Sequence, residues 1–315
     1  MALTLAESAK LCQDDLQRGV IETFVQESPI LDRLPMIDVQ GNAYAYNEEL
    51  TLPGVAFRAV NTAYVESTGT VNPKTESLKI LGGDADLDRF IVQTRGNLND
   101  QRAVQARLKV KAAVYSYHDT FFNGSVGTDV NSFDGLKTRL TGGQVITAGT
   151  NGLAVLGADD NARHAFLDKL DEAISVVANP GAIYCNRAIL FKIKSSARRL
   201  GKWAQTITDF GKTIDYYDGI PLLDAGTKSD GTTNVLPQTE TQGTAAGICS
   251  SIYVVGFSQG EDEIGVAGLT NGGVMVDDLG MVSDKPVYRT RIEFYCGMAA
   301  FGGRAASRLG GVLNS

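Results

Sequence analysis

The longest uninterrupted helical pattern of the chain spans residues 97–123 and contains neither Pro nor Gly. Asn97 is expected to cap its start, and Asn123-Gly124 is expected to end it with a left-handed residue. At a rise of 1.5 Å per residue this helix is about 40 Å long, more than a compact domain needs to cross its own core. On a helical wheel its apolar residues form two neighbouring stripes, Val104, Leu108, Tyr115 and Phe122 in one and Ala103, Val110, Val114 and Phe121 in the other.

Three polar residues, Arg107, Lys111 and His118, lie between the two stripes. In one interpretation their aliphatic stems cover apolar surface while the charged ends reach solvent. In the other, two different bodies pack on the two stripes, and carboxylates of a partner meet the polar residues between them. The chain has one further histidine, His164, and neither histidine has a Cys or a carboxylate at metal-ligand spacing, so both are interpreted as helix-surface or packing residues.

Two segments before this helix have apolar surfaces that need a partner. Residues 4–24 place apolar side chains at helical spacing, among them Leu16, Val20 and Phe24, and form an amphipathic arm that stops at Ser28-Pro29. Residues 36–82 alternate as strands around a tip rich in turn residues. A two-stranded ribbon is only marginally stable in water. Either another subunit supports it, or the hairpin folds back on its own domain.

The rest of the chain mixes helices and strands, which makes the fold class α+β. An acidic strand precedes the long helix, with Ala85, Leu87 and Phe90 expected to face inward. The remaining expected elements are helices at 160–178 and 186–200, strands at 144–147, 182–185, 288–300 and 305–313, a hairpin at 213–223 turned at Asp218-Gly219, strands at 251–257 and 263–269 paired around Gly260, and an exposed loop at 229–247.

Composition narrows the function classes. The 315 residues exceed what one core usually organises, which favours two lobes or one lobe with long extensions. Lys and Arg number 29 against 36 Asp and Glu, and the net charge of −7 argues against a protein that grips duplex nucleic acid. The four cysteines are far apart and are expected to be buried thiols rather than a zinc site or a disulfide framework. The sequence shows no signal peptide and no membrane span, so synthesis in the cytosol is expected.

Catalytic motifs are missing from the sequence. There is no phosphate-binding loop, no nucleophile elbow and no dinucleotide-binding fingerprint. Residues 261–263 are acidic, and a solvated turn is favoured there over a cation site. We therefore predict no catalytic, cofactor-binding or metal-binding residues and no cofactor. An α/β enzyme stays open as a hypothesis of another class, and it would require a deep polar pocket with perturbed titratable groups.

The order of these parts resembles the major capsid protein of tailed bacteriophages, whose shell fold is shared with encapsulins. That order is an amphipathic arm, an extended ribbon, an acidic strand, a long helix, a mixed α/β lobe and long strands at the C-terminal end. The resemblance covers essentially the whole chain, and the stretches that carry it are residues 28–35, 179–200, 219–222 and 288–313.

The resemblance implies a division of the chain and a structural, non-enzymatic function. Subunits would form the pentamers and hexamers of an icosahedral phage head that encloses double-stranded DNA without reading its sequence. The implied parts are an arm at 1–35, an extended loop at 36–82, a peripheral domain at 83–130 and 271–301, and an axial domain at 131–270 and 302–315. The predicted subunit-contact residues are Leu16, Val20, Phe24, Tyr44, Tyr46, Phe57, Arg58, Tyr64, Lys74, Arg107 and Lys111.

The implied partners are other copies of the chain, a portal, decoration proteins and packaged DNA, in a virion assembled in the bacterial cytoplasm. Because the arm begins almost at the initiator Met, a separate scaffolding protein or assembly without a scaffold is expected. Lys74 and Lys79 lie in the ribbon region, but no partner Asn for a covalent cross-link is identified. The alternative is an encapsulin-type compartment that encloses an enzyme.

Overall fold

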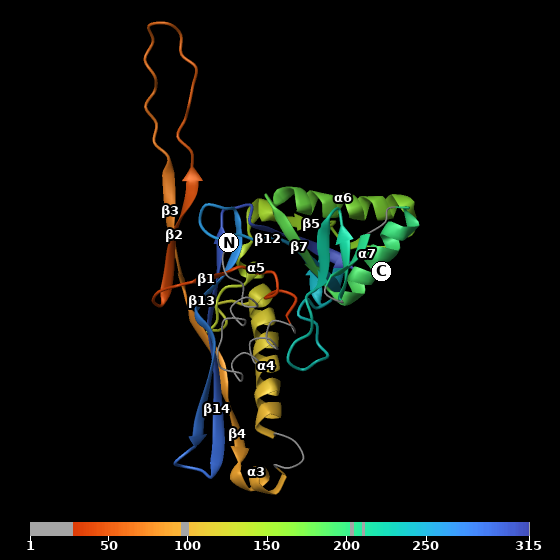
Figure 1. Cartoon of the computed structure of the whole chain (residues 1–315). Coiled ribbons are helices and arrows are strands. Elements are labelled where there is room, and N and C mark those ends of the chain that lie inside the picture. Colours follow the sequence, from red (N-terminus) through yellow and green to blue (C-terminus); the bar gives the residue numbers. More distant parts are fainter. Residues whose placement is uncertain (1–27, 96–100, 202–204, 210–211, 315) are drawn as a thin grey trace.

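The computed structural model describes residues 28–95, 101–201, 205–209 and 212–314. Within them the chain forms a four-stranded sheet, a nine-stranded sheet and a two-stranded ribbon that projects beyond both (Figure 1). The helices are α3 (Arg89–Arg95), α4 (Gln101–Asn123), α5 (Leu136–Arg139), α6 (Asp160–Val176) and α7 (Arg187–Arg199), with a 3-10 turn η1 at Gly142–Gln144.

The four-stranded sheet has the order β1-β13-β14-β4. Its strands are β1 (Met36–Asp38), β4 (Lys79–Asp88), β13 (Gly265–Met281) and β14 (Val287–Phe301). Strands β13, β14 and β4 are antiparallel, and β1 joins β13 in parallel. The predicted long strand at 288–300 is confirmed as β14. On β4, Leu87 is buried as expected, whereas Phe90 is exposed because it belongs to α3.

The nine-stranded sheet contains the order β5-β15-β12-β7-β10-β9-β8, with β6 on β15 and β11 on β12. Its strands are β5 (Val145–Thr147), β6 (Leu153–Ala154), β7 (Pro180–Cys185), β8 (Gln205–Asp209), β9 (Lys212–Tyr217), β10 (Ile220–Asp224), β11 (Glu240–Gln242), β12 (Ala245–Gly256) and β15 (Ala306–Leu313). Helices α6 and α7 share one core cluster with this sheet. The helices expected at 160–178 and 186–200 and the strand between them are confirmed.

The hairpin turn at Asp218-Gly219 is also confirmed. Asp218 and Gly219 have φ values of 50° and 77°, so both central residues of the turn are left-handed, as in the two-residue hairpin turns that match strand twist. Strand β9 returns as β10 in antiparallel register, with Tyr217 opposite Ile220.

Two expectations for the C-terminal half are wrong. The strands expected at 251–257 and 263–269 do not form a hairpin, because β12 pairs with β7 and β15 while β13 pairs with β14 and β1. A single bridge between Phe257 and Val266 marks where the chain passes from one sheet to the other. The loop expected to be exposed at 229–247 places Val235 and Leu236 in the main core and contains β11.

Helix α4 connects the two sheets. Its C-terminal half is the centre of the largest core cluster, where the Tyr117 ring lies 5.9 Å from Phe294 of the four-stranded sheet. The Phe122 ring lies 5.6 Å from Tyr184 and 5.2 Å from Tyr253 of the nine-stranded sheet. Two bodies thus pack on this helix, although they share its C-terminal half rather than lying along separate stripes. In its N-terminal half, Val104 and Leu108 of the first stripe remain exposed.

The end of α4 at Asn123 is confirmed, and its predicted cap Asn97 lies outside the described residues. Gly124 is not left-handed, which corrects the expected helix stop. A Cβ on Gly124 would lie 2.3 Å from the carbonyl oxygen of Phe133, and one on Gly135 would lie 2.4 Å from that of Thr120. The two glycines are joined by a 2.9 Å backbone hydrogen bond from Gly135 to Gly124. Close approach of two backbone segments, not turn geometry, requires glycine here.

Candidate assembly surfaces

The ribbon is the part of the chain least supported by its own subunit. Strands β2 (Ala43–Thr51) and β3 (Thr70–Ser77) pair in antiparallel register, from Ala43 opposite Ser77 to Thr51 opposite Thr70. Beyond them, residues 52–69 form a tip that extends away from both sheets (Figure 1). The large apolar side chains of the tip are all exposed: Leu52, Val55, Phe57, Val60, Tyr64 and Val65. The alternative in which the hairpin folds back on its own domain is therefore wrong for the tip.

The tip has local order of its own. The Arg58 guanidinium lies 5.0 Å from the centre of the Tyr64 ring and donates hydrogen bonds to the backbone oxygens of Ala59 and Thr62. Asn61 has a φ of 65°, and the Thr62 amide donates to the Ala59 oxygen across the turn. The sequence-predicted contact residues Phe57, Arg58 and Tyr64 thus lie together on an exposed turn.

The base of the ribbon is attached to its own subunit through aromatic residues. Tyr46 is buried, its ring lies 5.0 Å from that of Phe301, and its hydroxyl donates to the Ala300 oxygen at 3.2 Å. Burial raises the pKa of Tyr46 to about 12, with a further contribution from the charge of Glu76. Tyr44 is half-buried beside it and donates to Glu261 at 2.9 Å. Both tyrosines, predicted from sequence as subunit contacts, make intramolecular contacts here.

A second attachment of the ribbon is an ion pair with α5. Arg139 donates to both carboxylate oxygens of Glu76 on β3, at 2.5 and 2.7 Å, and both side chains are largely buried. Nearby, the Lys74 ammonium lies 2.7 Å from the Glu48 carboxylate. These four residues border a cleft of about 200 Å³ between the ribbon and residues 300–306. No sequence pattern predicts this contact, because Glu76 and Arg139 lie 63 positions apart in unrelated segments.

The N-terminal half of α4 presents a mixed surface. Arg107 is exposed beside Leu108, of which 57% is exposed. Lys111 is half-buried, with its ammonium 5.7 Å from the Tyr115 ring. Arg107 and Lys111 therefore fit the interpretation in which the aliphatic stems cover apolar surface and the charged ends reach solvent. His118 does not fit it.

His118 of α4 is buried beside Ser28, which is buried as well. Its Nε2 lies 2.5 Å from the Ser28 hydroxyl, which also accepts a hydrogen bond from the Leu31 amide at 2.9 Å. Because the hydroxyl accepts from Leu31, it is placed to donate to an unprotonated Nε2. Burial lowers the pKa of His118 to about 4, so the ring is neutral at physiological pH. His164 is exposed on α6, so each histidine matches one of the two roles expected from sequence.

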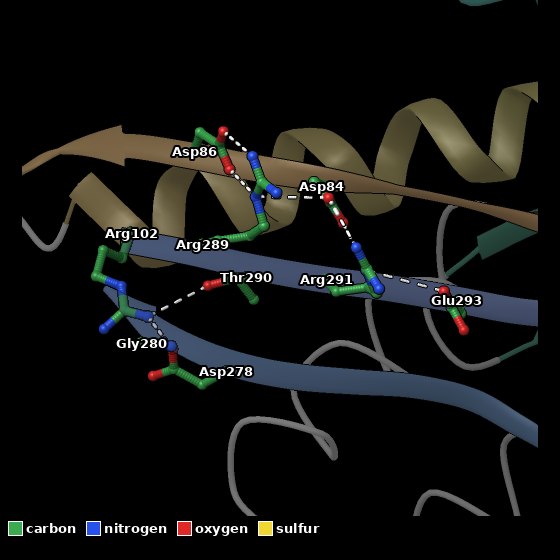
Figure 2. Close-up of polar contacts among 9 residues, drawn as sticks. All are labelled: Asp84, Asp86, Arg102, Asp278, Gly280, Arg289, Thr290, Arg291 and Glu293. Atoms are coloured by element: carbon green, nitrogen blue, oxygen red, sulfur yellow. Dashed lines mark hydrogen bonds and ion pairs between the residues drawn. The ribbon is translucent and has the colours of Figure 1, made fainter. Parts of the chain in front are cut away.

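At the end of the four-stranded sheet near α3, one face is polar and the other is apolar, whereas at the other end both faces are buried. On the polar face, Arg289 and Arg291 of β14 each donate two hydrogen bonds to a carboxylate of β4, to Asp86 and Asp84 respectively (Figure 2). The alternate residues Ile292 and Phe294 are buried against α4. This period-two arrangement is visible in the sequence, where acidic residues alternate on one strand and basic residues on the other.

The start of α4 is tied to the same sheet. Arg102 lies 2.5 Å from Asp278 of β13 and 3.4 Å from the Thr290 hydroxyl of β14 (Figure 2). The hydrogen bond from Arg102 is the main cause of a lowered Asp278 pKa. The contact fixes the orientation of the first turn of α4 over the sheet.

Among the described residues, no group of His, Cys, Asp or Glu side chains is arranged to hold a metal ion. No helix in that part of the chain is long and apolar enough to cross a membrane. Cys185, Cys249 and Cys296 are buried free thiols, as expected, and Cys12 lies outside the described residues. The predicted contacts Leu16, Val20 and Phe24 also lie outside them.

Comparisons with known proteins agree with this geometry. Residues 13–157, a little under half of the chain, match the family model described as major capsid protein GP7. Among solved structures, the encapsulin of the holo-SrpI complex from Synechococcus elongatus PCC 7942 is 18% identical with a TM-score of 0.67, covering 100% of this chain and 98% of that one. No curated protein matches the chain.

A phage structure and a capsid are also similar. The structure of Microbacterium phage Oxtober96 matches with 12% identity and a TM-score of 0.59, covering 90% of each chain. The capsid of a native GTA particle matches with 13% identity and a TM-score of 0.61, covering 92% of this chain and 90% of that one. At these identities the likeness establishes the fold. The predicted resemblance to the shell fold of phage capsid proteins and encapsulins is therefore confirmed.

Proposed function

We propose that this chain, which has the shell fold of phage capsid proteins and encapsulins, assembles with copies of itself into the icosahedral head of a tailed phage and encloses double-stranded DNA. The observation that carries the proposal is the ribbon tip, whose large apolar side chains are exposed on an ordered turn. Val55 is 98% exposed and Val65 is 88% exposed in the single chain.

Packing of the ribbon tip on a neighbouring subunit buries these exposed apolar side chains and so stabilises the contact between subunits. Each large apolar side chain contributes roughly 1.5–3 kcal/mol when it is transferred from water to a packed contact. Monomeric proteins rarely keep a contiguous apolar patch of this kind exposed unless it binds something. A ribbon that extends beyond its own body can place the patch on the next copy and so link subunits into a closed surface.

The charge of the chain supports enclosure of DNA without tight binding. The net charge is −7, so a shell built from many copies carries a net charge of the same sign as DNA. Packaged DNA then stays free to enter and leave. The portal, scaffolding and decoration proteins expected from the resemblance belong to this proposal, as does the virion as the place of action.

The likeness to the SrpI encapsulin, which covers all of this chain, supports a second candidate function. In that case the shell encloses a protein cargo and contains no genome. The two candidates share the same assembly chemistry and differ only in contents.

Microscopy of the chain expressed alone tests the proposal, together with mass photometry of the same sample. Closed particles tens of nanometres across support the shell function. Nuclease-resistant DNA in particles from infected or induced cells then favours the phage head, and a co-purifying enzyme favours the compartment. A chain that stays near 33.6 kDa, alone and with a candidate scaffolding protein, contradicts both.

A further inference from the structure

Helix α7 carries a concentration of positive charge that is unusual for this acidic chain. Its 13 residues include five basic side chains and no acidic one, whereas the whole chain has a net charge of −7. The basic residues are Arg187, Lys192, Lys194, Arg198 and Arg199.

The apolar inner face of α7 packs the helix onto the sheet, and this apolar packing does not explain the positive charge of the helix. Ile189 and Ile193 are buried in the core of the nine-stranded sheet, and Asn186 caps the helix by accepting a hydrogen bond from the Ala188 amide. On the outer face, Phe191 is 54% exposed between the cations of Arg187 and Lys194, which lie 5.9 and 6.0 Å from its ring centre.

Most of these cations form no ion pair with a described residue, although the charge of Arg187 acts on the nearby Asp224 carboxylate. Lys194 is paired with Asp215 at 2.9 Å. Within the described part of the chain, none of the other four forms an ion pair. Arg187, Arg198 and Arg199 are exposed. The outer face of α7 is therefore a cationic surface around an exposed aromatic ring, and it is suited to an anionic partner.

The same lobe carries an acidic surface on a different element. Helix α6 exposes Asp168 and Asp171, and the β9–β10 turn exposes Asp218. Tyr217 donates to Asp171 at 2.7 Å. Asp168 lies three residues before Asp171 on α6 and Asp218 follows Tyr217 in the chain, so this hydrogen bond brings the three carboxylates into one region. Burial and the hydrogen bond raise the pKa of Tyr217.

Two of those three carboxylates are available to a partner. Asp171 is engaged by Tyr217, but Asp168 and Asp218 form no ion pair with any described residue. Helices α6 and α7 are separate edges of the helical layer over the nine-stranded sheet (Figure 1). One lobe thus presents a cationic surface on α7 and an anionic surface on α6 and the β9–β10 turn.

We propose that the cationic face of α7 docks against the Asp168 and Asp218 edge of the next copy of the chain, head to tail around a rotation axis. This inference rests on the proposed shell function. Two different patches that meet between copies form a heterologous contact, and such contacts close into rings when the rotation closes. Opposite charges also offset the repulsion between acidic subunits and fix which edges meet. A nucleic-acid partner is disfavoured because each subunit carries a net charge of −7.

Charge exchange between the two edges tests this contact. The variant Arg187→Glu/Arg198→Glu places anions opposite anions, and we expect it to raise the protein concentration needed for half-assembly by about tenfold or more. Adding Asp168→Lys/Asp218→Lys restores opposite charges, so assembly is expected to return towards the wild-type concentration. Mass photometry across a dilution series measures both effects, and unfolding midpoints confirm that the unassembled subunits remain folded.

The matched control restores the same net charge at a different place. Asp262→Lys/Glu263→Lys changes two exposed acidic residues of the loop after β12, beside Tyr44 at the ribbon base. Combined with Arg187→Glu/Arg198→Glu, it is expected not to restore assembly. Equal rescue by both combinations contradicts the proposed contact, because net charge alone would then explain the result.

Two further outcomes separate this inference from the shell function. If Arg187→Glu/Arg198→Glu assembles like the wild type but loses binding to a 30-base-pair DNA in fluorescence anisotropy, α7 binds nucleic acid and the subunit contact is refuted. If the wild-type chain forms neither rings nor shells under any condition, with or without a scaffolding protein, the shell function itself fails. Undiminished shells from the α7 variant overturn the docking contact alone.

Discussion

The ribbon and the nine-stranded sheet are both built from strands with alternating or continuous apolar residues, yet they differ in where those residues lie. In the nine-stranded sheet, Ile183 and Val254 are fully buried, because α6 and α7 cover one face and α4 approaches the other. In the ribbon tip, Val55 and Phe57 contact almost nothing in their own chain. The apolar residues of the body are buried within one subunit, whereas those of the ribbon tip remain exposed.

The base of the ribbon resembles the body, because its side chains are buried against their own subunit. Tyr46 is buried on Phe301, and Arg139 holds Glu76 through two hydrogen bonds. These contacts fix the direction of the ribbon before any partner arrives. A preoriented ribbon loses less conformational freedom on docking than a free hairpin would. The comparison therefore separates three zones: a self-sufficient body, a fixed junction and a tip whose apolar side chains are exposed, which we propose to pack on a neighbouring subunit.

Removing the tip is the strongest test of that separation. Replacing residues 52–69 by a two-residue Asn-Gly turn between β2 and β3 is expected to leave a folded, soluble subunit and to abolish shells. The lost residues contribute no buried core, so the midpoint of urea unfolding should stay unchanged. Normal shells from this variant, seen by microscopy, would refute the bridging role of the ribbon.

A side chain placed at the close backbone contact between Gly124 and Gly135 is expected to destabilise the body and not the ribbon. In Gly135→Ala the new methyl group meets backbone atoms of residues 120, 121 and 124 at 2.4–2.9 Å, and backbone cannot move aside as a side chain can. We expect the free energy of unfolding to fall by about 3 kcal/mol or more, with a lower yield of soluble protein. Gly143→Ala is the control, because a Cβ there meets no atom within 4 Å and its φ is not positive.

Local signals explain which parts of the fold could be predicted from sequence. The caps of α6 and α7 are side chains that accept hydrogen bonds from amides within three residues: Asp159 accepts from the Ala162 amide and Asn186 from the Ala188 amide. The Asp218-Gly219 turn is equally local. The ribbon tip was also predictable, because residues 52–69 offer turn residues and no core pattern.

The wrong predictions concern contacts between residues that are far apart in the sequence. Residues 251–257 and 263–269 look like a hairpin, but their partners lie in two different sheets, and no short-range pattern specifies that choice. Gly124 looks like a left-handed stop because its reason, a crossing of two backbone segments, exists only in the folded chain. The junction residues Arg139 and Glu76 were missed for the same reason, whereas the alternating charges of β4 and β14 were available to sequence analysis.

Acidification is expected to weaken the body through His118. Its pKa is lowered to about 4 in the folded state, against about 6.5 in the unfolded chain, so the unfolded state binds more protons between these values. The stabilisation from neutral His118 is complete above pH 6.5 and is lost as the pH falls towards 4, in total about 3 kcal/mol.

Comparison with two variants isolates this contribution. His118→Gln is expected to flatten the dependence of the unfolding free energy on pH between 4 and 6.5, as measured by urea unfolding of unassembled subunits. His164→Gln, at the exposed histidine, should leave the wild-type slope intact. An unchanged slope in His118→Gln would show that other groups cause the acid sensitivity.

At the junction, Arg139→Met is expected to loosen the ribbon without unfolding the body. The substitution leaves the largely buried Glu76 carboxylate without its two hydrogen bonds and costs about 2 kcal/mol locally. Hydrogen exchange should speed up at the base of β2 and β3 more than in the nine-stranded sheet. Arg139→Lys keeps the charge but loses the paired geometry, so an intermediate effect is expected. Equal exchange rates in all three proteins would argue that Tyr46 alone holds the ribbon.

The smallest effect is expected on the polar face of the four-stranded sheet. Asp86→Asn removes the carboxylate that Arg289 contacts, but the pair lies at the surface, where solvent screens the charges (Figure 2). We expect the unfolding temperature to change by less than about 2 °C and the difference to vanish in 1 M salt. Ile292→Ala, on the opposite face of β14, should lower it much more because that side chain is buried against α4. A large, salt-independent effect of Asp86→Asn would mean that another molecule covers this face. The face would then count among the assembly surfaces and not with the self-sufficient body.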